Sequence, residues 1–177
     1  MLSGKTNTGI TSATPAGSYA VLYSVYGYDP ETGKAGMINI EETLAAVDAA
    51  SSVCDLPIMC TMTVEADGSI FSGGNAIEAS VSLEAAGADA VGINCSVGPD
   101  QLVSVVRSIK ENVSIPVIAK PNAGMPTIDD KGQAVYSMNA EDFASYMKVL
   151  IESGASVVGG CCGTTPAFIK ALHDSIR

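Results

Sequence analysis

Basic residues are scarce in this sequence. Its 177 residues include 9 Lys and Arg against 19 Asp and Glu, a formal net charge of −10. A chain this acidic is repelled by the phosphates of nucleic acids and by anionic membrane surfaces. We therefore expect a small molecule or another protein as its partner, and neither a nucleic acid nor a membrane.

Long apolar runs and paired cysteines are also missing. No apolar run reaches the roughly 18 residues that cross a bilayer. The five cysteines are an odd number, which leaves at least one thiol free, and no positively charged, apolar leader opens the chain. We expect a soluble protein with reduced thiols, as in the cytoplasm.

Histidine occurs once, which limits the catalytic chemistry. His173 lies near the carboxyl end of the predicted last helix, where we expect a favourable charge rather than a base or a metal ligand. A triad built on histidine would need a second chain. Gly73-Gly74 and Gly159-Gly160 lack the spacing and the Lys-Ser or Lys-Thr of a phosphate-binding loop, so we reject a nucleotide site.

Short apolar segments alternate with helical patterns from residue 37 onward. The predicted strands are Pro57–Val64, Ala88–Cys95, Pro116–Asn122 and Val157–Cys161. The predicted helices span residues 39–53, with Asn39 as the cap, and then 76–86, 99–112, 140–153 and 166–176, and residues 129–132 form a predicted hairpin tip. This alternation predicts the α/β class, with right-handed βαβ units around a parallel sheet whose carboxyl edge carries function.

The first 36 residues follow no such pattern, so we separate a lead (1–36) from a domain (37–177). Residues 1–17 are polar and without periodicity, which predicts a mobile segment. Residues 19–26 predict a strand, although their three tyrosines also fit a helical stripe. In either case we expect core or interface residues.

Three cysteines lie where predicted strands end. Cys95 closes the second strand, and Cys161 and Cys162 follow the fourth. Neighbouring strand side chains point to opposite faces, so Cys161 and Cys162 reach one metal only if the backbone turns, which the flanking glycines permit. Three thiolates would make a zinc site with one open position, but from spacing alone they fit small buried residues equally well.

Five further residues have two interpretations each. Asn94 and Asn122 could orient a ligand or fill an open metal position, or they could cap turns. Lys120 could contact a carboxylate or serve the strand structurally. Cys54 and Cys60 have no partner at ligand spacing, and we interpret both as core or surface thiols.

The sequence motifs together resemble the homocysteine S-methyltransferase family. They are Gly92-Ile-Asn-Cys-Ser96, Lys120-Pro-Asn-Ala-Gly-Met-Pro126 and Gly159-Gly-Cys-Cys-Gly-Thr-Thr-Pro166. The likeness covers about Met37 to Arg177 and is greatest to the homocysteine-binding modules of cobalamin-dependent methionine synthases. It implies that Cys95, Cys161 and Cys162 bind zinc. It also implies methyl transfer to zinc-bound homocysteine thiolate, giving methionine, with cobalamin and methyltetrahydrofolate supplied by partner modules or another methyl donor used instead.

The resemblance also implies a (β/α)8 TIM barrel, of which this chain would be a partial barrel of about four carboxyl-terminal βα units. The family's glycine-rich first-strand motif is missing, and Ala35-Gly36 replaces the Glu-Thr that precedes the residue matching Met37. Those elements help hold the amino acid part of homocysteine. Open sheet edges predict self-association, cover by residues 19–26, or an amino-terminal half-barrel partner. The alternative function is a non-catalytic zinc-binding fragment or subunit.

Overall fold

The structure is a computed structural model that describes residues 27–28, 35–36, 40–70 and 73–177. The chain divides into two units, 1–39 and 40–177. In the first unit, β1 (Gly27–Tyr28) and β2 (Ala35–Gly36) pair antiparallel. The strand predicted over residues 19–26 and the Asn39 cap lie outside the described residues.

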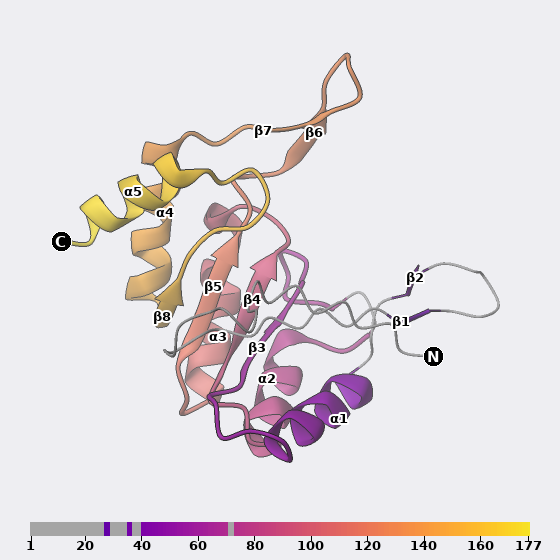
Figure 1. Ribbon diagram of the computed structural model, residues 1–177. Coiled ribbons are helices and arrows are strands. Elements are labelled where there is room, and N and C mark those ends of the chain that lie inside the picture. Colours follow the sequence, from indigo (N-terminus) through magenta and orange to yellow (C-terminus); the bar gives the residue numbers. More distant parts are fainter. Residues whose placement is uncertain (1–26, 29–34, 37–39, 71–72) are drawn as a thin grey trace, which may run out of the picture. The chain divides into compact units, whose positions relative to one another are not determined.

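Helices and strands alternate along the second unit (Figure 1). Its parallel sheet has the order β3-β4-β5-β8, built from β3 (Met59–Met62), β4 (Ala90–Cys95), β5 (Val117–Pro121) and β8 (Ala155–Val158). The helices are α1 (Ile40–Ser51), α2 (Ala76–Ala85), α3 (Val103–Asn112) after the 3-10 turn η1 (Pro99–Gln101), α4 (Ala140–Glu152) and α5 (Pro166–Ser175). The predicted α/β alternation and parallel sheet are confirmed.

The hairpin predicted after the third strand is also present. Its strands are β6 (Pro126–Ile128) and β7 (Ala134–Tyr136), which pair antiparallel. At its tip, the carboxylate Oδ1 of Asp129 accepts hydrogen bonds from the backbone N–H groups of Lys131 and Gln133, at 2.9 and 2.8 Å. This side-chain turn explains why the chain reverses there.

The last strand ends earlier than predicted. The prediction was Val157–Cys161, but β8 stops at Val158, and its register with β5 shifts between Val117 and Ile118. The cause is the pair Gly159-Gly160, because glycine weakens a strand and permits a bend. Cys161 and Cys162 therefore lie in the loop after β8, where the backbone is free to turn.

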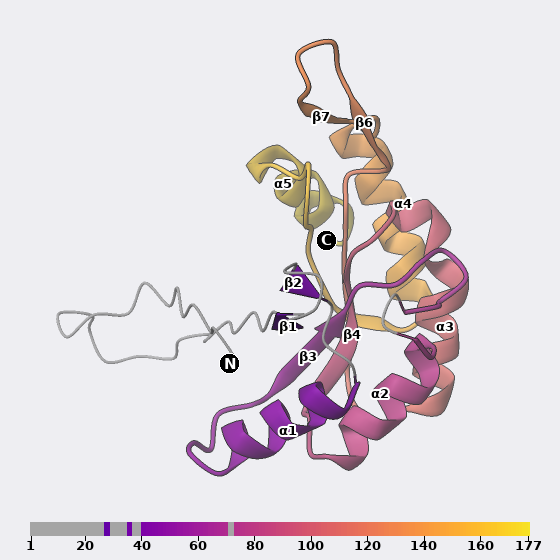
Figure 2. The ribbon, with the colours of Figure 1, turned by 90° about the vertical axis from the view of Figure 1, so that its right-hand side faces the viewer.

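Helices α2, α3 and α4 cover one face of the sheet (Figure 2). The core there is closely packed, with 0% exposure for Val91, Ile93, Val117, Ala119, Val106, Ile109, Phe143, Met147 and Leu150. Strand alternation places Asn94 and Lys120, which are paired in register, on the opposite face. Among the described helices, none combines the length and apolarity needed to cross a membrane.

Candidate metal centre

Three thiols from two segments meet at the carboxyl edge of the sheet. Cys95 is the last residue of β4, and Cys161 and Cys162 lie in the loop between β8 and α5. The Sγ atoms of Cys95 and Cys162 are 3.6 Å apart, those of Cys161 and Cys162 are 3.9 Å apart, and all three lie within 4.8 Å of one another. All three are free thiols, so the cluster could hold a metal ion.

The backbone turns sharply where β4 delivers Cys95. Cys95 and Ser96 have φ of 62° and 70°, a left-handed conformation that costs a non-glycine residue on the order of 1 kcal/mol or more. The turn is held by the Ser96 hydroxyl, whose Oγ accepts the N–H of Val64 at 2.9 Å. Backbone strain of this kind is concentrated at functional sites, which makes this turn a candidate for one.

The loop that carries the other two thiols is fixed by backbone hydrogen bonds to the end of β5. The N–H of Cys161 donates to the carbonyl of Pro121 at 2.8 Å, and the carbonyl of Cys162 accepts the N–H of Ala123 at 2.9 Å. Gly163, with φ of 79°, then turns the chain toward α5. The loop therefore continues the pairing with the β5 segment after β8 itself has ended.

Asn122 links the two thiol segments. Its side chain is 4% exposed, its Nδ2 donates to the carbonyl of Ser96 at 2.7 Å, and its Oδ1 accepts the N–H of Cys162 at 3.0 Å. Both ends of the amide are therefore used on the backbone beside the cysteines. Asn94 is half-buried at the end of β4, and within the described residues its side chain makes no hydrogen bond.

Tyr136, at the end of β7, is a residue of the site that the sequence patterns did not single out. Burial, followed by the neighbouring Cys162, raises the pKa of Tyr136. Its ring lies on Gly163, where an added Cβ would be 2.3 Å from the ring atom Cγ.

The three thiols have unequal proton affinities. Burial, together with hydrogen bonds to Cys162 and Cys161, raises the pKa of Cys95 to about 12. The hydrogen bond from Cys95, followed by those from Cys161 and Tyr136, lowers the pKa of Cys162. Without a cation, negative charge therefore collects on Cys162, and Cys95 keeps its proton.

We expect iodoacetamide to alkylate Cys162 well before Cys95 in the metal-free, reduced protein at neutral pH. The thiolate is the reacting species, and the lowered pKa of Cys162 gives it the larger thiolate fraction. Peptide mass spectrometry over a time course measures both rates. The two rates should converge as the pH approaches the pKa of Cys95, and equal rates at pH 7 would contradict the assignment.

Cys54 and Cys60 lie away from the cluster. Cys54 is exposed after α1, with its Sγ 3.5 Å from the carbonyl of Ala50. Cys60 packs against the core from β3, and burial raises its pKa. Cys54 is thus a surface thiol, and Cys60 is a thiol packed against the core.

The two candidate cations lie in different surroundings. Lys120 is half-buried on β5, its stem beside Gly159, and it makes no ion pair with any described residue. His173 is exposed near the end of α5, with its Nδ1 3.2 Å from Oδ1 of Asp174. His173 is not part of the thiol cluster and has a carboxylate neighbour on its own helix.

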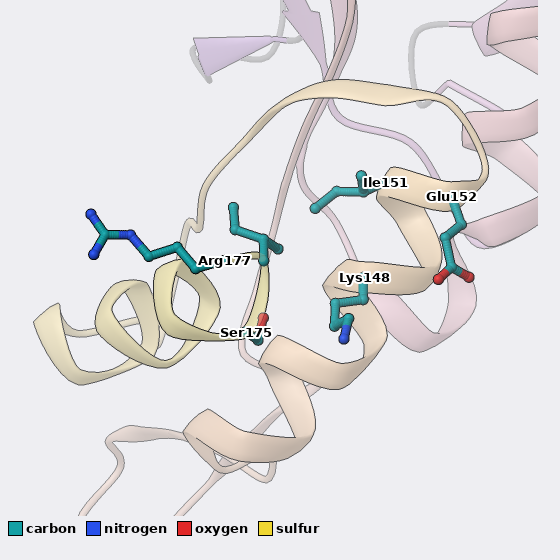
Figure 3. Close-up of a pocket in the computed structure, with 6 residues that line it drawn as sticks. Lys148, Ile151, Glu152, Ser175 and Arg177 are labelled. Carbon is teal, nitrogen blue, oxygen red and sulfur yellow. The ribbon is translucent and has the colours of Figure 1, made fainter.

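A cavity at the carboxyl end of the chain is a separate feature (Figure 3). It has a volume of about 310 Å³ and lies between α4 and the chain end, lined by Lys148, Ile151, Glu152, Ser175, Ile176 and Arg177. The end of α4 leads into the start of β8, whereas the cysteines follow the end of β8. The cavity and the thiol cluster therefore belong to opposite edges of the sheet.

Comparison with known proteins identifies the family. The sequence matches the family Homocysteine S-methyltransferase over residues 35–176. Methionine synthase of Mycobacterium tuberculosis is 38% identical over 122 residues, which are 68% of this chain and 10% of that protein. Homocysteine S-methyltransferase 2 of Arabidopsis thaliana is 37% identical over 89 residues, 49% of this chain and 26% of that protein.

Solved structures show the same fold. The homocysteine methyltransferase MmuM from Escherichia coli superposes with a TM-score of 0.62 in its oxidised form and 0.61 in its metallated form. Each shares 22% sequence identity over 77% of this chain, and the match covers 42% and 41% of those chains. This chain thus spans less than half the length of the proteins it matches. The match over residues 35–176, with the motifs that meet at the thiol cluster, places the chain in the homocysteine S-methyltransferase family.

Proposed function

We propose that the chain carries the thiol-activating site of a zinc-dependent homocysteine S-methyltransferase. The observation that supports this is the cluster of Cys95, Cys161 and Cys162, whose sulfur atoms lie 3.6 to 4.8 Å apart. Sulfur ligands at a zinc–sulfur distance of 2.3 Å around a tetrahedron are about 3.8 Å apart. The cluster thus fits a zinc ion that keeps one position open.

Zinc held by three thiolates would supply a Lewis acid that keeps a fourth thiol, that of homocysteine, deprotonated at neutral pH. The residues of the chain provide the rest. The three cysteines must lose their protons, and the raised pKa of Cys95 makes it the last to do so. Asn122 would keep the two loops together while the homocysteine thiolate attacks the methyl group of the donor, and the donor would leave with the electron pair of the broken bond, which gives the thioether methionine.

We infer further that the four βα units are half of a (β/α)8 barrel. The sheet has two edge strands, β3 and β8, which pair on one side only among the described residues. Parallel strands are normally covered and paired on both sides. A second copy of the chain, or an amino-terminal half carrying the first-strand motif, would complete the sheet and hold the amino acid part of homocysteine.

A second candidate is a zinc-binding subunit without catalysis, which is favoured because Ala35-Gly36 stands where the family has Glu-Thr. One experiment separates the two: X-ray absorption of the zinc-loaded protein with homocysteine or with homoserine, which has a hydroxyl in place of the thiol. If the protein is the enzyme, we expect a fourth sulfur ligand on zinc with homocysteine but not with homoserine. We also expect methionine to form once a methyl donor is added.

Three sulfurs under both conditions would instead support the non-catalytic subunit. Light scattering on the same sample measures the molecular mass and so tests whether a second copy of the chain is the partner. A mass of two chains is expected if copies complete each other, and a stable monomer that forms methionine would exclude that requirement.

A further inference from the structure

Strand β5 lies between the two strands that deliver the thiols. In the order β4-β5-β8, Cys95 ends β4, and Cys161 and Cys162 follow β8. Lys120 lies near the carboxyl end of β5, and its register partner on β4 is Asn94, the residue before Cys95. Both side chains are on the face of the sheet opposite helices α2, α3 and α4 (Figure 2). A lysine therefore stands between the two thiol segments, at the same edge of the sheet.

The stem of Lys120 is packed, whereas its charge has no partner. A Cβ added at Gly159 would lie 3.5 Å from Cγ and 3.9 Å from Cδ of Lys120, so the stem crosses the backbone where the cysteine loop begins. The side chain is half-buried, and among the described residues no carboxylate lies within salt-bridge distance of it. A partly desolvated ammonium group without a counter-charge is stabilised when an anion binds beside it.

The surroundings of Lys120 on this face are polar only near the thiol segments. The side chain of Asn94 is half-buried and makes no hydrogen bond with any described residue, so its amide is also available to a ligand. Two residues earlier along the three strands, the same face carries Gly92, Ile118 and Val157, which are paired in register. The polar layer of Lys120 and Asn94 therefore adjoins the thiol site, and the layer below it is apolar.

We propose that Lys120 is a substrate-binding residue, whose Nζ donates a charge-assisted hydrogen bond to the carboxylate of the thiol substrate. This proposal rests on the proposed function, because the thiol of the same substrate has to reach the cysteine cluster. Homocysteine carries its thiol and its carboxylate on one short chain, so a cation between the two thiol segments suits it. A thiol without a carboxylate gains nothing from Lys120. Further contacts to the amino acid part would come from the chain that completes the barrel.

The first test measures by calorimetry how tightly the zinc-loaded protein binds three thiols. They are homocysteine, 4-mercaptobutanoate, which lacks the amino group, and 3-aminopropanethiol, which lacks the carboxylate. Lys120→Met keeps an apolar stem over Gly159 but removes the charge. We expect this variant to bind homocysteine and 4-mercaptobutanoate about 10-fold more weakly, which is the loss of one charge-assisted hydrogen bond, and to bind 3-aminopropanethiol as before.

The matched control is Lys131→Met, which removes an exposed lysine at the tip of the β6–β7 hairpin. It should bind all three thiols as the wild type does. An equal loss for all three thiols in Lys120→Met would show that Lys120 serves the structure of the site and not the carboxylate. Unchanged binding of homocysteine and 4-mercaptobutanoate would also overturn the proposal.

The second test needs no metal, so it separates this proposal from a failure of the proposed function. The lysines of the metal-free protein are dimethylated with ¹³C, which keeps their charge, and the NMR signal of Lys120 is the one missing from Lys120→Arg. Methionine, which has the carboxylate but no thiol, should shift that signal. Its analogue without the carboxylate, 3-(methylthio)propylamine, should not. A Lys120 signal that methionine leaves unchanged, or that responds equally to both compounds, would refute the carboxylate contact.

Discussion

Cys161→Ser is expected to reduce bound zinc from near one per chain to almost none after dialysis. A serine hydroxyl keeps its proton at neutral pH and is a poor zinc ligand, so two thiolates remain where three are needed. Changing an outer partner of a metal ligand already costs about 10- to 100-fold in affinity. Loss of a ligand itself should cost more.

The measurement is metal content by mass spectrometry on reduced protein, with Cys54→Ser as the matched control. Cys54 is a free, exposed thiol outside the cluster, so its replacement removes one sulfur without touching the site. The control should keep its zinc. If Cys161→Ser retained as much zinc as Cys54→Ser, Cys161 would not be a ligand and the proposed centre would be wrong.

Asn122→Ala is expected to destabilise the fold by about 3 kcal/mol. A buried polar group left without a hydrogen-bond partner costs about 1–3 kcal/mol, and this variant leaves two such backbone groups unpaired. The carbonyl of Ser96 and the N–H of Cys162 both lose their partner. Because these groups flank Cys95 and Cys162, zinc affinity should also fall by about 10- to 100-fold. Urea unfolding and zinc titration measure the two effects.

The control for this variant is Asn112→Ala. Asn112 also donates from Nδ2 to a carbonyl, that of Ser108 at 2.8 Å, but it does so in an exposed position at the end of α3. Water replaces that bond, so the loss should stay within about 0.5 kcal/mol. Equal losses in the two variants, or unchanged zinc affinity in Asn122→Ala, would show that Asn122 does not hold the loops together.

The alternation of helices and strands was predictable because the local signals agree with the tertiary fold. Asn75 and Asn139 cap α2 and α4, with Asn75 accepting the N–H groups of Ile77 and Glu78, and Gly87 and Gly154 follow these helices at positive φ. Each signal acts within a few residues. The end of β8 was mispredicted because the predicted strand was extended through Gly159-Gly160 to Cys161, whereas these glycines release the backbone from strand geometry.

The site was predictable only in part. Parallel strands bring their carboxyl ends to one edge, which placed Cys95, Cys161 and Cys162 near one another, but only the family resemblance favoured a shared metal site over small buried residues. The roles of Asn122 and Tyr136 did not follow. Asn122 had two interpretations of equal weight, and Tyr136 had none.

By itself, the sequence determined the α/β class, the order of strands and helices along the chain, and the residues that could bind a metal. These features depend on local periodicity and on side-chain chemistry. Only the tertiary structure decided that the Asn122 amide joins Ser96 to Cys162, that Cys95 turns through a left-handed backbone, and that Tyr136 rests on Gly163. Those contacts join residues far apart in the chain. Their geometry depends on how the sheet edge packs, which no local pattern contains.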